Sequence, residues 1–337
     1  MSTEAKRFYP HPENREVKQQ PIYTARIYPG QGSQFPGMGK ELYKTNSFAQ
    51  KIYREADNIS RRMRGPKIIE LSFEADEQTL MKTENVQPVI FTHNFVCEQI
   101  LIQQGAEGYT TSPWALAGSS LGEYNTLVTS KAMTFENALK LVIIRGKLMA
   151  DADSINPGGL LAVTIDENDP RLEQALNNFH LQISLINTKN QTILGGKNDD
   201  INNAGEWLKT NIGPRSFTLL PVKGAFHTSL MQPCVDEFSD ILSTFPIRKA
   251  KIPIIANTLA SPIQTPDEIR EELVNQLTNT VLWRDSMLYI TKNGVEHMFE
   301  PGTDRAILSR MNETISGGKM TRRIFPGVPA SAWAKSS

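Results

Sequence analysis

A serine between two glycines, where an apolar run meets a helical segment, limits the fold of this chain more than any other feature. Gly118, Ser120 and Gly122 follow the apolar residues 114–117 and open a predicted helix over 121–128. A strand that turns this sharply into a helix leaves no room for neighbouring side chains, so glycines flank the serine. The pattern predicts a nucleophile elbow, with the Ser120 hydroxyl above a helix N-terminus that stabilises negative charge. The alternative is an ordinary β–α turn in which the serine caps the helix.

Apolar strands alternate with helices along most of the chain, which predicts an α/β fold with a mostly parallel sheet. Helical patterns continue from the first glycine-rich loop to about residue 110. Strands are expected at residues 22–28, 114–117, 252–256 and 295–300, and helices at 121–128, 136–150 and 266–278.

The sequence pattern changes after residue 156, where short strands and two helices are expected within about 65 residues. This pattern predicts a small ferredoxin-like α+β insert. Strands are expected at residues 160–165, 182–186, 191–194 and 217–222, and helices at 170–179 and 200–211. We therefore expect a discontinuous α/β-hydrolase-like domain over 22–152 and 219–326, and a small domain over 153–218. Residues 1–21 are expected to form an N-terminal arm, and residues 327–337 a flexible tail.

Composition excludes several classes of protein. The 337 residues contain 36 Lys and Arg and 36 Asp and Glu, so net charge is +0, whereas a nucleic-acid binder would carry a basic excess. Cys97 and Cys234 offer neither a disulfide framework nor zinc-ligand spacing, which predicts a reducing, cytoplasmic location and no metal. No apolar run approaches about 20 residues, so no membrane contact is expected, and the N-terminus lacks a signal-peptide core.

A serine needs a base to accept its proton, and His227 is the best-placed of the five histidines. It follows the strand expected at 217–222 directly, at the edge where α/β sheets place catalytic groups. No Asp or Glu nearby completes a triad, so a backbone carbonyl would orient the ring. The alternative is a loop histidine with a structural role. His93 and His180 are expected to be structural, His11 lies in the expected arm, and His297 enters an expected strand.

Arg145 rises from the apolar face of its predicted helix, since residues three and four positions away are Leu141, Val142, Leu148 and Met149. A buried unpaired charge is costly, so the guanidinium should meet a carboxylate. Either a protein Asp or Glu supplies it, as in most buried arginines, or a substrate acid does.

The glycine-rich loop over residues 30–39 lacks the patterns that bind phosphate. It is better suited to an oxyanion hole, in which the backbone N–H of Gln31 pairs with that of Leu121.

Five separate segments together resemble the malonyl-CoA:acyl carrier protein transacylases, over about residues 22–315. In order, they are PGQGSQ at 29–34, GSSLGE at 118–123, IRGKLM at 144–149, GAFH at 224–227 and FEPG at 299–302. The stretch LGEYN at 121–125 looks most like the free-standing, trans-acting acyltransferases that serve modular polyketide synthases.

The resemblance implies roles for the residues already singled out. Ser120 would form the acyl-enzyme ester, and His227 would act as base and then acid. Gln31 and Leu121 match the oxyanion-hole positions, through their backbone amides. Arg145 matches the arginine that pairs with the malonyl carboxylate.

The resemblance also implies supporting residues. Gln276 matches the residue whose backbone carbonyl steadies the histidine, and Asn257 and Asn187 match asparagines near the active site. Phe226 would crowd out an α-methyl branch and so favour malonyl. Ser119 departs from the family pattern, which has histidine there, so the pocket beside the acyl chain should be larger or wetter.

The implied reaction moves malonyl from malonyl-CoA to the phosphopantetheine thiol of an acyl carrier protein, for polyketide or fatty acid synthesis, with no cofactor in the enzyme. The alternatives are an acyl hydrolase that clears carrier proteins and a non-catalytic carrier-protein docking module. A monomer is expected. Carrier proteins are acidic, so basic clusters are candidate contacts, or simply solvated faces. They are Arg61, Arg62, Arg64, Lys67, Lys189, Lys197, Lys223, Arg248, Lys249 and Lys251.

Overall fold

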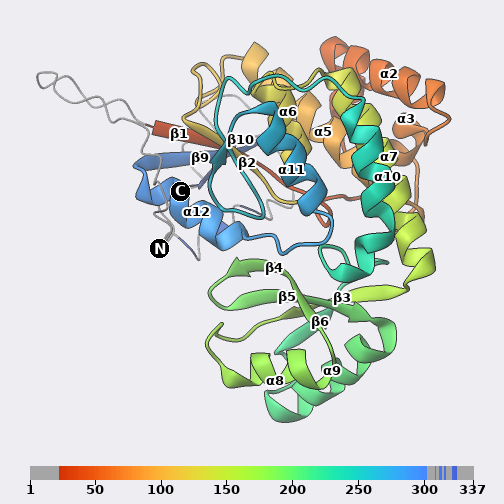
Figure 1. The fold of residues 1–337 in the computed structure, drawn as a ribbon. Helices are drawn as coiled ribbons and strands as arrows, with labels where there is room; N and C mark the ends of the chain where they lie inside the picture. The colour runs from red at the N-terminus through yellow and green to blue at the C-terminus, as the bar shows by residue number, and fades with distance from the viewer. Residues whose placement is uncertain (1–22, 302–307, 309–310, 313–314, 316–320, 325–337) are drawn as a thin grey trace, which may run out of the picture.

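The computed structural model describes residues 23–301, 308, 311–312, 315 and 321–324. A large α/β part and a small α+β part lie against each other, the small part at the bottom of Figure 1. The expected arm at 1–21 and tail at 327–337 lie outside the described residues. No helix among the described residues combines the length and the apolar character that a membrane crossing requires.

A six-stranded sheet forms the centre of the large part, in the order β10-β9-β1-β2-β7-β8. All neighbouring strands are parallel except β7 and β8. The carboxyl ends of β1, β2 and β7 therefore meet at one edge, where α/β sheets bind ligands. The strands are β1 (Tyr23–Tyr28), β2 (Ala115–Gly118), β7 (Ile254–Ile255), β8 (Pro262–Ile263), β9 (Val295–Pro301) and β10 (Thr321–Ile324).

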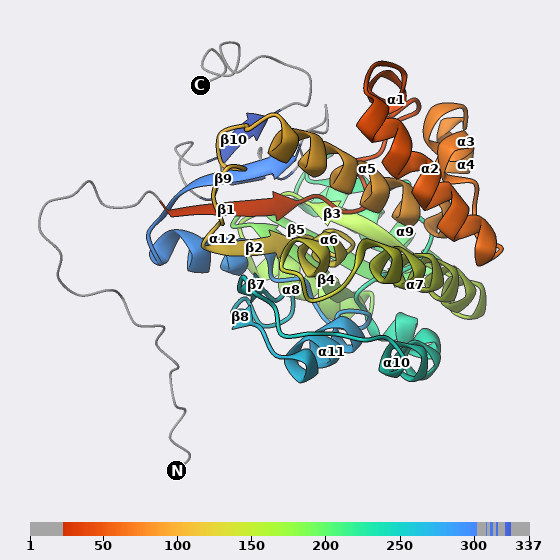
Figure 2. The same cartoon turned by 90° about the horizontal axis from the view of Figure 1, so that it is seen from above.

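Helices cover both faces of this sheet. Apolar side chains of β1 and β2 pack on α12 on one face, and α5, α6 and α7 contribute to the larger core on the other. Figure 2 shows α5, α6 and α7 beside the strands, with α2 outside them. The helices are α1 (Lys40–Thr45), α2 (Ser47–Arg62), α3 (Ile68–Phe73), α4 (Glu77–Leu80), α5 (Thr83–Gln103), α6 (Gly122–Thr129), α7 (Phe135–Ile155), the 3-10 helix η1 (Ser229–Cys234), α10 (Val235–Ser243), α11 (Pro266–Asn275) and α12 (Trp283–Lys292).

The small part is a four-stranded antiparallel sheet in the order β4-β5-β3-β6. Two helices cover its outer face, while its other face turns toward the large part (Figure 1). Successive side chains of β3 point to opposite faces of the sheet, so both faces are buried. Leu161 packs against the two helices, while Leu160 and Ala162 belong to the core of the large part. The elements are β3 (Gly158–Val163), α8 (Pro170–Asn178), β4 (Gln182–Thr188), β5 (Gln191–Lys197), α9 (Asn198–Asn211) and β6 (Phe217–Leu219).

The predicted fold class is confirmed, including the mostly parallel sheet and the ferredoxin-like order of the small part. The domain boundaries stay a prediction. The strand expected at 217–222 ends at Leu219, shortly before Pro221, whose nitrogen has no proton for a ladder. The strands β8 and β10 were not predicted.

Candidate active site

Ser120 occupies a sharp turn between β2 and α6, at a positive φ of 50°. The flanking glycines make this turn possible. A Cβ on Gly118 would lie 2.1 Å from the carbonyl carbon of Gly122, and a Cβ on Gly122 would lie 2.0 Å from the Tyr28 carbonyl oxygen. The turn thus holds the Ser120 side chain at the carboxyl edge of the sheet.

His227 faces this serine, with its Nε2 atom 2.7 Å from the Ser120 Oγ. Its Nδ1 atom lies 2.6 Å from the backbone carbonyl oxygen of Gln276. Because a carbonyl oxygen only accepts, Nδ1 carries the ring proton and Nε2 is free to accept from the serine hydroxyl. Burial, and then the nearby Arg145 guanidinium, lower the pKa of His227 to about 3. The ring is therefore neutral at physiological pH.

Arg145 points from α7 into the same site, although its side chain is fully buried. Its Nη1 donates to the Gln87 Oε1 at 2.8 Å, and its Nη2 donates to the Gln276 Oε1 at 2.9 Å and to the Ser120 Oγ at 3.2 Å. The guanidinium also lies over the Tyr124 ring, 5.4 Å from its centre. These partners are all uncharged.

The Nε atom of Arg145 is buried and has no hydrogen-bond partner among the described residues. Within the same residues, no carboxylate forms an ion pair with this guanidinium. The protein salt bridge, one of the two alternatives for a buried arginine, is therefore not found there.

Two amide side chains bind the main chain of Ser120. Its N–H donates to the Asn257 Oδ1 at 2.7 Å, and its carbonyl oxygen accepts from the Gln276 Nε2 at 3.1 Å. Both amides also donate to the buried carboxylate of Glu123. The predicted carbonyl contact of Gln276 is present, but its side chain makes further contacts that the sequence did not indicate.

The predicted oxyanion-hole segments lie against each other. A Cβ on Gly30 would lie 2.4 Å from the Ser119 carbonyl oxygen and 3.4 Å from the Leu121 nitrogen. The loop that carries Gln31 therefore runs directly beside Leu121, the residue before α6. The next N–H groups, those of Gly122, Glu123 and Tyr124, already donate to the carbonyl oxygens of Ser119, Ser120 and Leu121. Gln31 lines the same cavity as Ser120, and Leu121 follows Ser120 in the chain.

A cavity of about 440 Å³ lies between the two parts of the molecule, and Ser120, Arg145 and His227 all line it. Apolar residues of β3, β4 and β5 form one wall, and Phe226 stands beside His227. Asn187 also lines it but bonds Gln191 at 3.0 Å rather than a reactive group. The lining residues singled out from the sequence are Gln31, Ser119, Ser120, Arg145, Asn187, Phe226 and His227.

The other described histidines lie away from this cavity. His93 bonds the Tyr53 hydroxyl at 3.0 Å inside the helical core, His180 follows α8, and His297 lies on β9. His11 lies outside the described residues.

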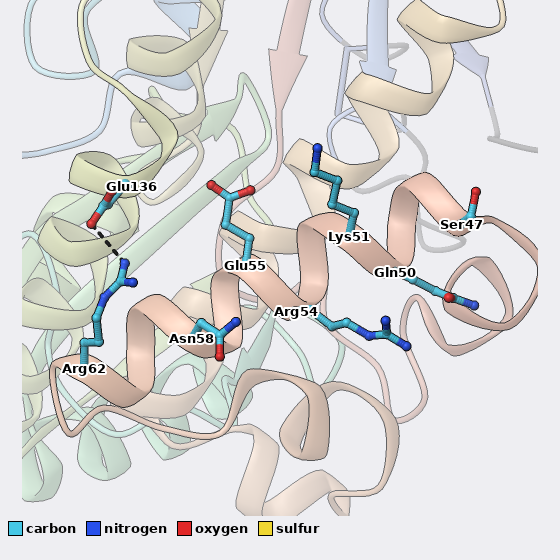
Figure 3. A pocket seen from close by; sticks show the side chains of 8 residues that line it. All are labelled: Ser47, Gln50, Lys51, Arg54, Glu55, Asn58, Arg62 and Glu136. Atoms are coloured by element: carbon cyan, nitrogen blue, oxygen red, sulfur yellow. Dashed lines mark hydrogen bonds and ion pairs between the residues drawn. The ribbon is translucent and has the colours of Figure 1, made fainter.

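A separate hollow on the outer side of α2 is lined by charged and polar residues (Figure 3). Its Arg62 forms an ion pair with Glu136 at 3.1 Å. Lys67 and Lys189, from the predicted basic clusters, pair with Glu70 and Asp166. These three cations are exposed, and their surface ion pairs are weak enough to exchange, so their role as carrier contacts stays a prediction.

Comparison with known sequences identifies the family of this chain. The model of the acyl transferase domain matches residues 26–300. The polyketide biosynthesis malonyl CoA-acyl carrier protein transacylase PksC of Bacillus subtilis is 33% identical over 279 residues, covering 82% of this chain and 91% of that protein. This chain belongs to the malonyl-CoA:acyl carrier protein transacylase family.

Solved structures of the family share its fold. The transacylase of Coxiella burnetii has a TM-score of 0.82 at 27% identity, covering 90% of this chain and 94% of that one. A malonyl-transacylase solved with a type II polyketide synthase acyl-carrier protein has a TM-score of 0.81 at 26% identity, covering 90% and 96%.

The roles of Gln87 and Glu123 were not predicted from the sequence. Gln87 accepts a hydrogen bond from Arg145, and Glu123 accepts hydrogen bonds from Asn257 and Gln276. Gln87 is a polar residue in α5, a helix buried along most of its length, and that contrast was an available signal. Glu123 is a carboxylate in the short buried helix α6, three residues after the nucleophile.

Proposed function

We propose that this protein transfers malonyl from malonyl-CoA to the phosphopantetheine thiol of an acyl carrier protein, through an ester on Ser120. The observation that carries the proposal is the meeting of Ser120, His227 and Arg145 in one cavity. A hydroxyl with a neutral base suits acyl transfer. A buried cation with uncharged partners, next to that hydroxyl, suits an acyl group that ends in a carboxylate.

The first half of the reaction loads the enzyme. The Nε2 atom of His227 takes the Ser120 proton while Oγ attacks the thioester carbonyl carbon. The backbone N–H groups of Gln31 and Leu121 stabilise the tetrahedral oxyanion. When the intermediate collapses, the carbon–sulfur bond breaks and the departing CoA sulfur takes the proton from His227.

The second half runs the same steps in reverse order with a new thiol. His227 takes the proton of the phosphopantetheine thiol, and the sulfur attacks the ester carbonyl carbon. The same two N–H groups hold the oxyanion. The carbon–oxygen bond to Ser120 then breaks, and Oγ recovers a proton from His227. The cycle is therefore ping-pong and consumes no water.

Arg145 provides selectivity for the acyl group. Its Nε and Nη2 atoms form one edge of the planar guanidinium, and this edge matches a carboxylate in two-point contact. Nη2 already reaches the Ser120 Oγ, and Nε has no partner among the described residues. A malonyl carboxylate bound there places its thioester carbon near the nucleophile.

The acyl carrier protein is proposed as the acceptor because a family member has been solved in complex with one. The relatives include proteins named for polyketide biosynthesis and proteins named simply as transacylases. Carriers from both kinds of pathway are therefore the acceptors to compare. A trans-acting role in polyketide synthesis predicts faster malonyl transfer to a carrier domain of a modular polyketide synthase than to a carrier protein of fatty acid synthesis.

The test is to mix the protein with malonyl-CoA and a carrier protein bearing phosphopantetheine, and to follow the masses of both proteins. Malonyl should appear first on the enzyme and then on the carrier, and Ser120→Ala should abolish both signals. Full transfer by Ser120→Ala would reject the ester on Ser120. Carrier binding without any transfer by the wild-type protein would favour the docking module. Release of free malonate without carrier product would favour the hydrolase instead.

A further inference from the structure

Glu123 is a fully buried carboxylate that the proposed reaction does not use. It lies in the first turn of α6, where the helix N-terminus favours a negative charge. Its Oε1 accepts from the Asn257 backbone N–H at 3.1 Å and from the Asn257 Nδ2 at 3.2 Å. Its Oε2 accepts from the Gln276 Nε2. Every hydrogen bond to this carboxylate among the described residues therefore comes from an N–H donor. Burial, and then the nearby Glu272 carboxylate, raise the pKa of Glu123 well above its usual range.

The orientation of each amide is determined by its other partners. The Gln276 Oε1 accepts from the Arg145 guanidinium, which only donates, so its Nε2 must face the Ser120 carbonyl oxygen and Glu123. The Asn257 Oδ1 accepts the Ser120 N–H, so its Nδ2 must face Glu123 and the Gly118 carbonyl oxygen. One carboxylate thus anchors both amides.

This network links the nucleophile to the guanidinium. Asn257 holds the N–H of Ser120, and Gln276 holds its carbonyl oxygen, so both sides of the serine main chain depend on Glu123. Gln276 also binds the Nη2 of Arg145. A substitution of Glu123 should therefore displace both the Ser120 hydroxyl and the Arg145 guanidinium.

We infer that Glu123 is a positioning residue that keeps Ser120 and Arg145 in register through the amides of Asn257 and Gln276. The inference deepens the proposed function and rests on it. Glu123 touches no substrate atom, since it lies behind the residues that line the cavity. Its effect appears mainly in selectivity, because a displaced Arg145 harms malonyl loading but not loading by an acyl group without a carboxylate.

The test compares loading of Ser120 by malonyl-CoA and by acetyl-CoA in Glu123→Gln. The glutamine keeps the shape, but its NH₂ group must face an N–H donor. The ratio of malonyl to acetyl loading rates should fall about tenfold, as expected for the loss of one hydrogen bond to a charged group. Glu98→Gln is the matched control, because Glu98 is equally buried but bonds Arg26 and Tyr28 away from the cavity. It should keep the wild-type ratio.

A second variant and a structure keep the inference falsifiable if Glu123→Gln folds poorly. Gln276→Leu removes the link itself and should lower the same ratio. In a crystal structure of Glu123→Gln, the Gln276 amide should turn away from Arg145. A wild-type ratio in Gln276→Leu, or equal losses for both acyl groups in Glu123→Gln, would overturn the inference. If the wild-type enzyme itself does not prefer malonyl, the proposed function fails, while the crystal structure still tests the network.

Discussion

Replacement of Arg145 by methionine should separate malonyl loading from acetyl loading. Methionine keeps most of the apolar stem on α7 and removes the charge. A malonyl carboxylate would then enter a buried cavity without its cation. Acetyl has no carboxylate, so its loading needs Ser120, His227 and the oxyanion-hole N–H groups but no cation.

General magnitudes for charge pairs give the expected loss of malonyl loading. Unit charges about 4 Å apart attract by about 4 kcal/mol near a protein surface, and loss of one partner from a buried pair costs about 3–5 kcal/mol. A loss of about 3 kcal/mol slows loading about 100-fold. Arg145 also binds the side-chain oxygens of Gln87 and Gln276. Those two oxygens lose a donor, so a lower melting temperature should accompany the change.

The assay is quenched-flow mixing with each acyl-CoA, followed by intact-protein mass spectrometry. Malonyl loading should fall at least about 100-fold while acetyl loading changes little. Arg26→Met is the control, because Arg26 is a buried arginine paired with Glu98 away from the cavity. It should lower stability without changing selectivity. Parallel losses of malonyl and acetyl loading in Arg145→Met would refute the role of Arg145.

Four further outcomes follow from the site. Because the pKa of His227 is lowered to about 3, loading should show no inflection near pH 6.5; such an inflection would mean that the base is not this buried ring. The unfolded chain binds this proton below about pH 6.5 and the folded one does not, so stability should fall toward pH 3 by up to about 1.4 kcal/mol per pH unit. Chemical denaturation should show a shallower fall in His227→Gln. Gly122→Ala should destabilise by at least about 2 kcal/mol, since its Cβ would meet the Tyr28 carbonyl oxygen at 2.0 Å; unchanged denaturation would contradict the tight turn. Phe226→Ala should raise loading by methylmalonyl-CoA relative to malonyl-CoA, and an unchanged ratio would show that Phe226 does not limit the acyl group.

The sequence was sufficient for the parts of the site that depend on local geometry. The glycines around Ser120 predict a tight turn because no other residue fits. The strand argument for His227 was wrong, because β6 ends at Leu219, eight positions before His227, and belongs to the antiparallel sheet of the small part. The apolar neighbours of Arg145 predict its burial. The apolar residues around Arg145 repeat at the spacing of a helix, so their burial can be predicted without knowing the fold.

The contacts behind the site were not predictable in this way. Gln87, Glu123 and Gln276 come from three different helices or their ends, and their pairing depends on how those helices pack. The same reason hides the uncharged partners of Arg145, because spacing along one helix does not reveal the facing helix. The strands β8 (Pro262–Ile263) and β10 (Thr321–Ile324) lack an apolar run like the one at residues 252–256 around β7, so no strand was predicted there.

The most direct measurement is a crystal structure of the protein trapped after loading with malonyl-CoA. The account predicts an ester on the Ser120 Oγ, with the malonyl carboxylate bound side-on by the Nε and Nη2 atoms of Arg145. An ester on another residue, or a carboxylate turned away from this guanidinium toward solvent, would contradict it.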